Sequence, residues 1–217
     1  MKRTLMTLAS AIGLAIGFAA SAAAPDITPS EREKALQYLA DTSKALVGAT
    51  KGLSEEQWRF KPAPDRWSVA EVVEHLALLE DLFANKLSAQ ISGAPAGKLD
   101  AAKVDAEILA KVPDRSTKFQ APDYLVPTGR WTPSEALEHF LADRRKTASF
   151  LTSMPDLRSH VLTHPALGAM DGYEWVLAVA AHTERHTKQI LEVKADPRFP
   201  ANTGFIEERR EQSKPAR

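Results

Sequence analysis

The sequence contains no cysteine among its 217 residues. This absence excludes disulfide bonds, thiolate zinc sites, cysteine nucleophiles and a lipid anchor attached through cysteine. Histidine and the carboxylates are therefore the main side-chain metal ligands that remain. The chain also lacks an excess of charge of either sign, with 28 lysines and arginines against 28 acidic residues, and it has no long basic cluster. We therefore do not expect it to bind nucleic acid.

The sequence also lacks repeats, and it lacks the alternation of apolar and polar residues that is typical of strands. Apolar residues make up 44% of the chain, which is enough for a substantial core and argues against global disorder. The length fits one domain, or at most two small ones.

The first 22 residues have the layout of a secretory signal peptide. Lys2 and Arg3 form a positive start, an uncharged and mostly apolar run follows over residues 5–20, and Ala20-Ser21-Ala22 is a small-residue cleavage motif. Cleavage there removes two of the 28 basic residues and leaves 26 against 28 acidic ones. We expect a periplasmic or secreted protein with no stable membrane insertion after cleavage. The alternative is an uncleaved membrane anchor.

Four segments of the remaining chain begin with helix start signals. Each pairs a capping side chain with a glutamate three residues later, and two also place proline at the first helical position. The four capping sequences are Thr28-Pro29-Ser30-Glu31, Ser68 to Glu71, Thr132-Pro133-Ser134-Glu135 and Asp171-Gly172-Tyr173-Glu174. Glycine or proline ends these segments near residues 48–52, 93, 154 and 194. A loop over 94–131, with one amphipathic segment at 101–111, connects the second helix to the third. We predict an all-α four-helix bundle over residues 23–196 and a polar tail over 197–217.

The most informative side chains for function are three histidines. His182 and His186 are four residues apart, so both lie on one face of the fourth helix, on the arc that carries its apolar residues. His75 lies at the margin of the apolar face of the second helix. Bundles build metal sites from residues on facing helices, and three imidazoles with an open position are typical of a catalytic zinc site. The alternative is ordinary helix histidines, one hydrogen-bonded and one half exposed.

Other polar residues near these helices are weaker candidates. Glu184 faces away from both imidazoles of its helix, so we expect it and Arg185 to form surface ion pairs. Glu80 projects toward the core, either as a partner of an imidazole or in a salt bridge with a base from the first or third helix. His139 is expected in solvent, and His164 in a loop near the site at most.

Several sequence segments, in this order, resemble the DinB-like superfamily. They are Trp67-Ser68-Val69-Ala70-Glu71-Val72-Val73-Glu74-His75-Leu76, then His164-Pro165-Ala166-Leu167-Gly168, Glu174-Trp175, and His182-Thr183-Glu184-Arg185-His186-Thr187-Lys188-Gln189-Ile190. The resemblance implies a four-helix bundle that tends to an up-down-down-up order. It also implies a three-histidine divalent metal site, whose ligands map to His75, His182 and His186.

Members of that superfamily include thiol-dependent S-transferases and isomerases, and many proteins assigned only as metal-dependent hydrolases. They often form dimers, so the resemblance leaves a homodimer open. The export signal departs from the family pattern, because the thiol cofactors of the transferase members are cytoplasmic.

Two functions follow from these features. The first is a metal-dependent hydrolase or transferase that acts on a small molecule outside the cytoplasm, with zinc or nickel favoured as the divalent ion and with its catalytic base unassigned. The second is a non-catalytic metal-binding or stress-related bundle. Imidazole ligands alone do not separate the metals or the two functions.

Overall fold

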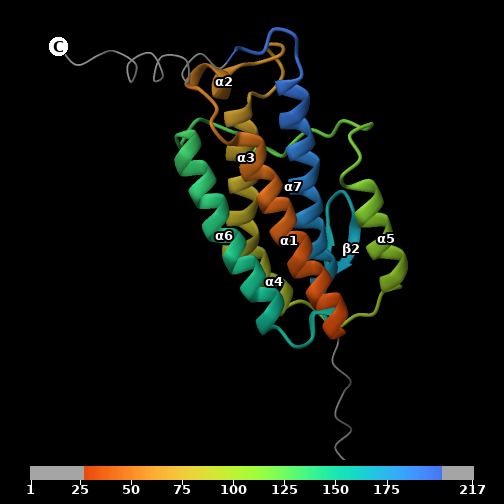
Figure 1. Ribbon diagram of the computed structural model, residues 1–217. Helices are drawn as coiled ribbons and strands as arrows, with labels where there is room; N and C mark the ends of the chain where they lie inside the picture. The colour runs from red at the N-terminus through yellow and green to blue at the C-terminus, as the bar shows by residue number, and fades with distance from the viewer. Residues whose placement is uncertain (1–26, 202–217) are drawn as a thin grey trace, which may run out of the picture.

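The computed structural model describes residues 27–201. Its four long helices are α1 (Pro29–Thr50), α3 (Val69–Leu82), α6 (Pro133–Ser153) and α7 (Gly172–Lys194). Figure 1 shows α1 and α7 running in one direction and α3 and α6 in the other, so the order along the chain is up-down-down-up. The predicted four-helix bundle is confirmed. The predicted leader over 1–22 and most of the predicted tail lie outside the described residues.

All four long helices begin at the capping boxes that the sequence predicts. At the start of α1, the Thr28 hydroxyl accepts a hydrogen bond from the Glu31 backbone N–H at 3.1 Å, and the Glu31 carboxylate accepts one from the Thr28 N–H at 2.7 Å. The same reciprocal pairs form at Ser68, Thr132 and Asp171. Each box satisfies two backbone donors that a helix start otherwise leaves unpaired.

The predicted second helix is present but changes its pitch along its length. After α3 the chain continues through a π-helical turn, η1 (Phe83–Leu87), into α4 (Ser88–Ser92), and it ends at Gly93 as expected. Single π-helical turns inside helices are uncommon. The side chain of Phe83 is fully buried at this turn.

The connections contain short elements, of which the sequence predicted one. The amphipathic segment forms α5 (Ala101–Lys111), which lies against α7. The stretch between α1 and α3 contains a further helix, α2 (Glu55–Arg59), which is not among the predicted helices and has its own capping box between Ser54 and Gln57. Two single 3₁₀ turns, η2 (Asp123–Leu125) and η3 (Leu157–Ser159), complete the connections of the described chain.

The expectation of a chain without strands was wrong at one place. The chain around His164, which the sequence places in a loop, forms an antiparallel hairpin of β1 (Val161–His164) and β2 (Gly168–Asp171), in which Val161 pairs with Asp171 and His164 with Gly168. The strands are only four residues long, and their burial does not alternate from one residue to the next, so they carry no period-two pattern. Gly168 has φ +82°, a conformation that favours glycine at the end of the turn.

The core runs the length of the bundle between two main helix pairs. Helix α1 packs against α7, and α3 packs against α6. One buried cluster lies toward the hairpin and includes Leu39, Phe83, Leu157, Met170 and Val176, and the other lies toward α2 and includes Leu46, Val72, Leu76, Phe140 and Ile190. Within residues 27–201 no helix has the length and apolar character needed to span a membrane.

Candidate metal centre

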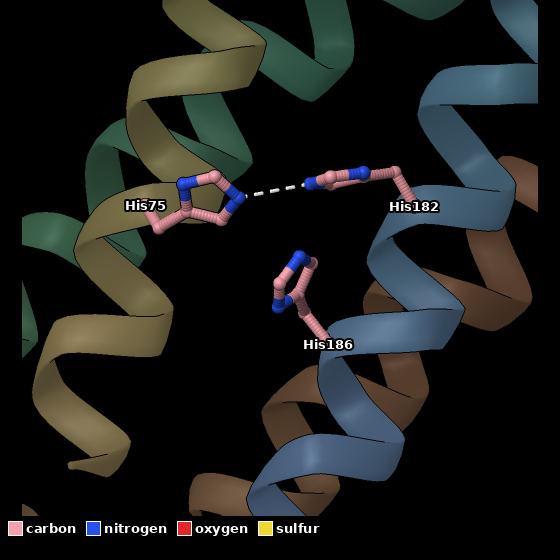
Figure 2. Close-up of side chains that lie close together, drawn as sticks. All are labelled: His75, His182 and His186. Atoms are coloured by element: carbon pink, nitrogen blue, oxygen red, sulfur yellow. Dashed lines mark hydrogen bonds between the residues drawn. The ribbon is translucent and has the colours of Figure 1, made fainter. Parts of the chain in front are cut away.

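Three histidines from two facing helices meet inside the bundle. His75 comes from the first half of α3, and His182 and His186 come from successive turns of α7. One ring nitrogen from each lies within 4.8 Å of the others. Nε2 of His75 is 2.9 Å from Nε2 of His182. Figure 2 shows the three rings pointing into the same space between α3 and α7. The structure thus brings together all three residues that the sequence singled out.

The outward-facing nitrogens of two rings are held by hydrogen-bond acceptors. His75 Nδ1 lies 2.8 Å from the backbone carbonyl oxygen of Leu125, and His186 Nδ1 lies 2.8 Å from Oε1 of Gln189. Carbonyl oxygens accept hydrogen bonds and cannot donate them, so both Nδ1 atoms carry the proton. In a neutral ring the remaining lone pair then lies on Nε2. For His75 and His186 that lone pair is the one available to a ligand in the site.

Burial keeps these rings in their neutral form. His75 is 2% exposed and His186 is 8% exposed. Burial lowers the pKa of His75, although its hydrogen bond to Leu125 raises that pKa in part. Burial also lowers the pKa values of His182 and His186 well below the ordinary histidine value, and the neighbouring imidazoles and arginines lower them further, although the hydrogen bond to Gln189 raises the pKa of His186 in part. Neutral imidazole is the form that binds metal ions.

The donor set fits a divalent ion. Two nitrogens bound to one tetrahedral zinc at roughly 2.0–2.1 Å lie about 3.3 Å apart, which is a few tenths of an ångström more than the observed separation of His75 and His182. The set consists of nitrogen ligands alone, which suits zinc, nickel, copper or iron rather than magnesium or calcium. In the described part of the chain, no other three His, Asp or Glu side chains are gathered in this way.

Trp67 packs against the imidazoles, and Glu74 holds the loop that contacts His75. The Trp67 ring centroid is 4.9 Å from that of His75 and 6.3 Å from that of His186. Glu74 is buried beside His75, and its carboxylate accepts hydrogen bonds from the backbone N–H groups of Thr128, Gly129 and Arg130 at 2.9, 2.8 and 3.2 Å. The loop that supplies the Leu125 carbonyl is therefore fixed to the same helix as the imidazole that it contacts.

The other polar candidates lie outside the histidine cluster. Glu80 pairs with Arg144 of α6 at 2.6 Å, which is the salt bridge with a third-helix base that the sequence left as one of two options. His139 is exposed and stacks on Trp131, with ring centroids 4.4 Å apart. His164 ends β1, and its Nδ1 accepts hydrogen bonds from the backbone of the following turn.

The prediction for Arg185 was wrong. Glu184 does pair near the surface, with Lys188 at 2.7 Å, and accepts a hydrogen bond from the Tyr38 hydroxyl. Arg185 is buried instead, and its guanidinium donates to the backbone carbonyls of Val112, Asp114 and Thr117. Its role is to fix the loop after α5 against α7. Residue spacing on α7 alone could not reveal that another segment of chain covers this face.

Sequence reasoning missed the groups that orient the ligand rings. The Leu125 carbonyl is a backbone atom of a loop, so no side-chain pattern marks it. Gln189 lies three residues after His186 on the same helix face, and this spacing is a signal that could have found it. Arg115, which contacts Gln189, comes from the loop after α5.

A groove of about 550 Å³ lies elsewhere, between the end of α1, α2 and the start of α6. Val47, Trp58 and Leu137 contribute to its lining, and none of the histidines does. Its position gives it no part in the chemistry of the histidine cluster.

Comparison with known proteins places the chain in a family. A model of the DinB superfamily matches residues 38–190. The uncharacterised protein YuaE of Bacillus subtilis strain 168 is 27% identical over 146 residues, which cover 66% of this chain and 87% of that protein. The solved structure of YfiT from Bacillus subtilis matches with a TM-score of 0.51 at 16% identity, and the match covers 77% of this chain and 88% of the YfiT chain. YfiT is described as a probable metal-dependent hydrolase with an unusual four-helix bundle topology. The chain belongs to the DinB superfamily.

Proposed function

We propose that His75, His182 and His186 hold a divalent metal ion and that the protein is a metal-dependent hydrolase or transferase of a small molecule. The observation that carries the proposal is the gathering of three imidazoles, with ring nitrogens within 4.8 Å and no carboxylate or thiolate among them. The description of YfiT as a probable metal-dependent hydrolase supports it by analogy.

Each residue of the site has a definable part in that function. His75 and His186 present Nε2 lone pairs because their Nδ1 protons are held by Leu125 and Gln189. Trp67 packs its ring against two of the imidazoles and limits access from that side. Three protein ligands leave a coordination position for water or substrate, where a bound ion lowers the pKa of water or polarises a substrate group.

The second candidate is a bundle that binds metal without catalysis. One observation favours it: the carboxylates of α3 and α7 that flank the histidines in sequence are already engaged. Glu74 binds the loop backbone, Glu80 pairs with Arg144, and Glu184 pairs with Lys188. None of these three is placed as a free general base.

The place of action is proposed from the leader sequence alone. The positive start at Lys2 and Arg3 and the uncharged run after it support an exported protein that meets a small-molecule substrate in the periplasm or outside the cell. A homodimer is part of this proposal because such assemblies are common among DinB-like proteins.

Elemental analysis of protein purified without a metal-affinity tag, followed by a substrate screen, tests the proposal. We expect about one equivalent of zinc or nickel per chain, in line with a single site. We also expect hydrolytic or thiol-transfer activity that a chelator abolishes and the same metal restores. Stoichiometric metal without activity in either screen supports the non-catalytic bundle, and protein that neither carries nor takes up metal contradicts both functions.

A further inference from the structure

A chain of hydrogen bonds connects His186 to the loop that follows α5. His186 Nδ1 donates to Oε1 of Gln189 at 2.8 Å, and the same oxygen accepts a hydrogen bond from Nη1 of Arg115 at 3.3 Å. Nε and Nη2 of Arg115 donate to the two carboxylate oxygens of Glu192 at 2.6 and 2.8 Å. Arg115 thus lies between a glutamine and a glutamate of α7, and it belongs to a different segment of the chain.

The order of donors in this chain decides which nitrogen of His186 carries the proton. A glutamine side chain has an acceptor end and a donor end of nearly the same shape, so its amide can turn over. If the donor end faced His186, Nδ1 would accept and the proton would move to Nε2. Nε2 would then have no lone pair for a ligand. Only the orientation with Oε1 toward the ring leaves Nε2 free.

Arg115 selects that orientation because a guanidinium has donors and no acceptor. Its Nη1 needs an acceptor oxygen at the position of Gln189 Oε1. If the amide turned over, the NH₂ group of Gln189 would stand at that position, and two donors would face each other. The two bonds to Glu192 fix the guanidinium plane and therefore the direction of Nη1. Arg115 is mostly buried, with a side chain 18% exposed, so water does not readily replace Gln189 as its partner.

We infer that Arg115 is a positioning residue that sets the tautomer of His186 through Gln189, and so prepares Nε2 of His186 to bind the metal ion. The inference rests on the proposed metal site for its functional meaning. The hydrogen bonds themselves place the proton whether or not an ion is bound. Outer hydrogen-bond partners of ligand histidines change metal affinity by 10–100-fold in proteins generally.

The test compares four forms of the protein that differ in the side chains at or near this series of hydrogen bonds. Arg115→Met keeps an apolar stem and removes every donor. Gln189→Glu in the Arg115→Met background restores an acceptor, because a carboxylate accepts at both oxygens and cannot turn a donor toward the ring. Lys188→Met is the matched control, since Lys188 contacts the same loop at the Pro113 carbonyl and has no bond to Gln189. The fourth form is the wild type, and circular dichroism checks the folding of each.

The first measurement is the tautomer of His186 in metal-free protein, read from long-range ¹H–¹⁵N correlations of ¹⁵N-histidine-labelled samples at pH 7.5. We expect the Nδ1–H form in the wild type and in Lys188→Met. We expect a mixture with the Nε2–H form in Arg115→Met, and a return to Nδ1–H in the double variant. An unchanged Nδ1–H form in folded Arg115→Met overturns the inference.

The second measurement is zinc affinity by competition with a chromophoric chelator. We expect Arg115→Met to bind zinc roughly 10–100-fold more weakly than the wild type, and the double variant to recover most of that loss. Loss of affinity that Gln189→Glu does not restore contradicts the inference. If the wild type binds no zinc while the tautomers change as expected, the proposed metal function fails and the positioning role of Arg115 stands.

Discussion

At the scale of single residues, burial and hydrogen bonding act together on the histidines. His75 and His186 are removed from water, and each donates its Nδ1 proton to an acceptor behind the ring. His182 faces His75 across the site at 2.9 Å. The three rings therefore converge on one point, whereas His139 lies in solvent against Trp131.

The first prediction concerns removal of single imidazoles. We expect His75→Ala, His182→Ala and His186→Ala each to lower metal occupancy strongly, because each removes one of three ligands, and we expect His139→Ala to keep wild-type occupancy. Metal content of the purified variants, with folding checked by circular dichroism, measures the effect. Equal occupancy in all four variants means that the metal site lies elsewhere or does not exist.

The second prediction concerns the pH dependence of stability in metal-free protein. The pKa values of His75 and His186 are lowered in the folded state, so the unfolded chain binds more protons as pH falls through about 6.5. Each buried imidazole then lowers the free energy of unfolding by up to about 1.4 kcal/mol per pH unit. Urea unfolding between pH 7.5 and 5.5 measures the slope.

The matched control for this slope is His75→Gln/His186→Gln, which keeps polar side chains and removes both titrations. We expect its stability to fall less steeply with acid than that of the wild type. Parallel slopes for the two proteins contradict the assignment of the acid sensitivity to these rings.

How far the sequence predicts the site depends on the kind of atom involved. The i, i+4 spacing of His182 and His186 fixes their common face from helix geometry alone, and His75 follows from its place beside the apolar stripe of α3. The Leu125 carbonyl and Arg115 come from a loop whose path depends on tertiary contacts such as those of Glu74 and Arg185. No local pattern encodes that path.

At the scale of the elements, capping motifs predict where the long helices begin. Hydrophobic periodicity is a poorer guide to the short elements. The boxes at Thr28, Ser68, Thr132 and Asp171 mark the four long helices to the residue. The box at Ser54 has the same chemistry, but α2 is only five residues long and was not predicted. The hairpin escaped prediction because it is held by backbone pairing, with few buried side chains.

The third prediction concerns the ion pair that joins α3 to α6. Glu80 is 1% exposed and Arg144 is 5% exposed. Arg144→Met leaves the Glu80 carboxyl buried without its charged partner and with only the hydrogen bond from the Thr147 hydroxyl, so we expect a loss of about 3–5 kcal/mol in the free energy of unfolding. Glu80→Leu/Arg144→Met removes both charges and is expected to recover most of that loss. Urea denaturation measures both.

Lys146→Met is the control for the removal of a base from α6. The Lys146 side chain is 56% exposed and pairs with the buried carboxylate of Asp143, so solvent screens this pair more than the Glu80–Arg144 pair, and we expect its loss to cost less than that of Arg144. If the double variant is as unstable as Arg144→Met, the loss of stability comes from the changed packing at this position and not from an unpaired charge.

At the scale of the whole molecule, the long connection from α4 to α6 lets the bundle place parallel helices side by side. The same connection passes over the histidines and supplies Leu125 to His75 and Arg115 to Gln189. Access to a metal ion therefore depends on this loop as well as on the helices. Tyr124, next to Leu125, is 63% exposed and lies at the outer surface of the loop.

The fourth prediction is that a metal ion in this site keeps an exchangeable position. Only three side-chain ligands gather in the described residues, whereas a structural zinc site normally has four. In cobalt-substituted protein we expect the visible absorption to change when a small anion or imidazole is added. A spectrum indifferent to every added ligand favours a closed, structural site.

The fifth prediction concerns the mature chain. We expect the exported protein to begin near Ala23, because Ala20-Ser21-Ala22 follows an uncharged run with a positive start. Intact-mass measurement of protein from the native periplasm tests this. A cytoplasmic species that still carries residues 1–22 contradicts it.

The distance along the chain between the ligands has a consequence for biosynthesis. His75 and His182 are 107 residues apart in sequence, and contacts between such distant residues form late because closing the intervening chain costs entropy. A nascent or translocating chain without α7 offers only one of the three imidazoles of the site, His75, which is a weak ligand on its own. Capture of an ion in the proposed site therefore follows completion of the fold, and the compartment where folding ends determines which metals the protein meets.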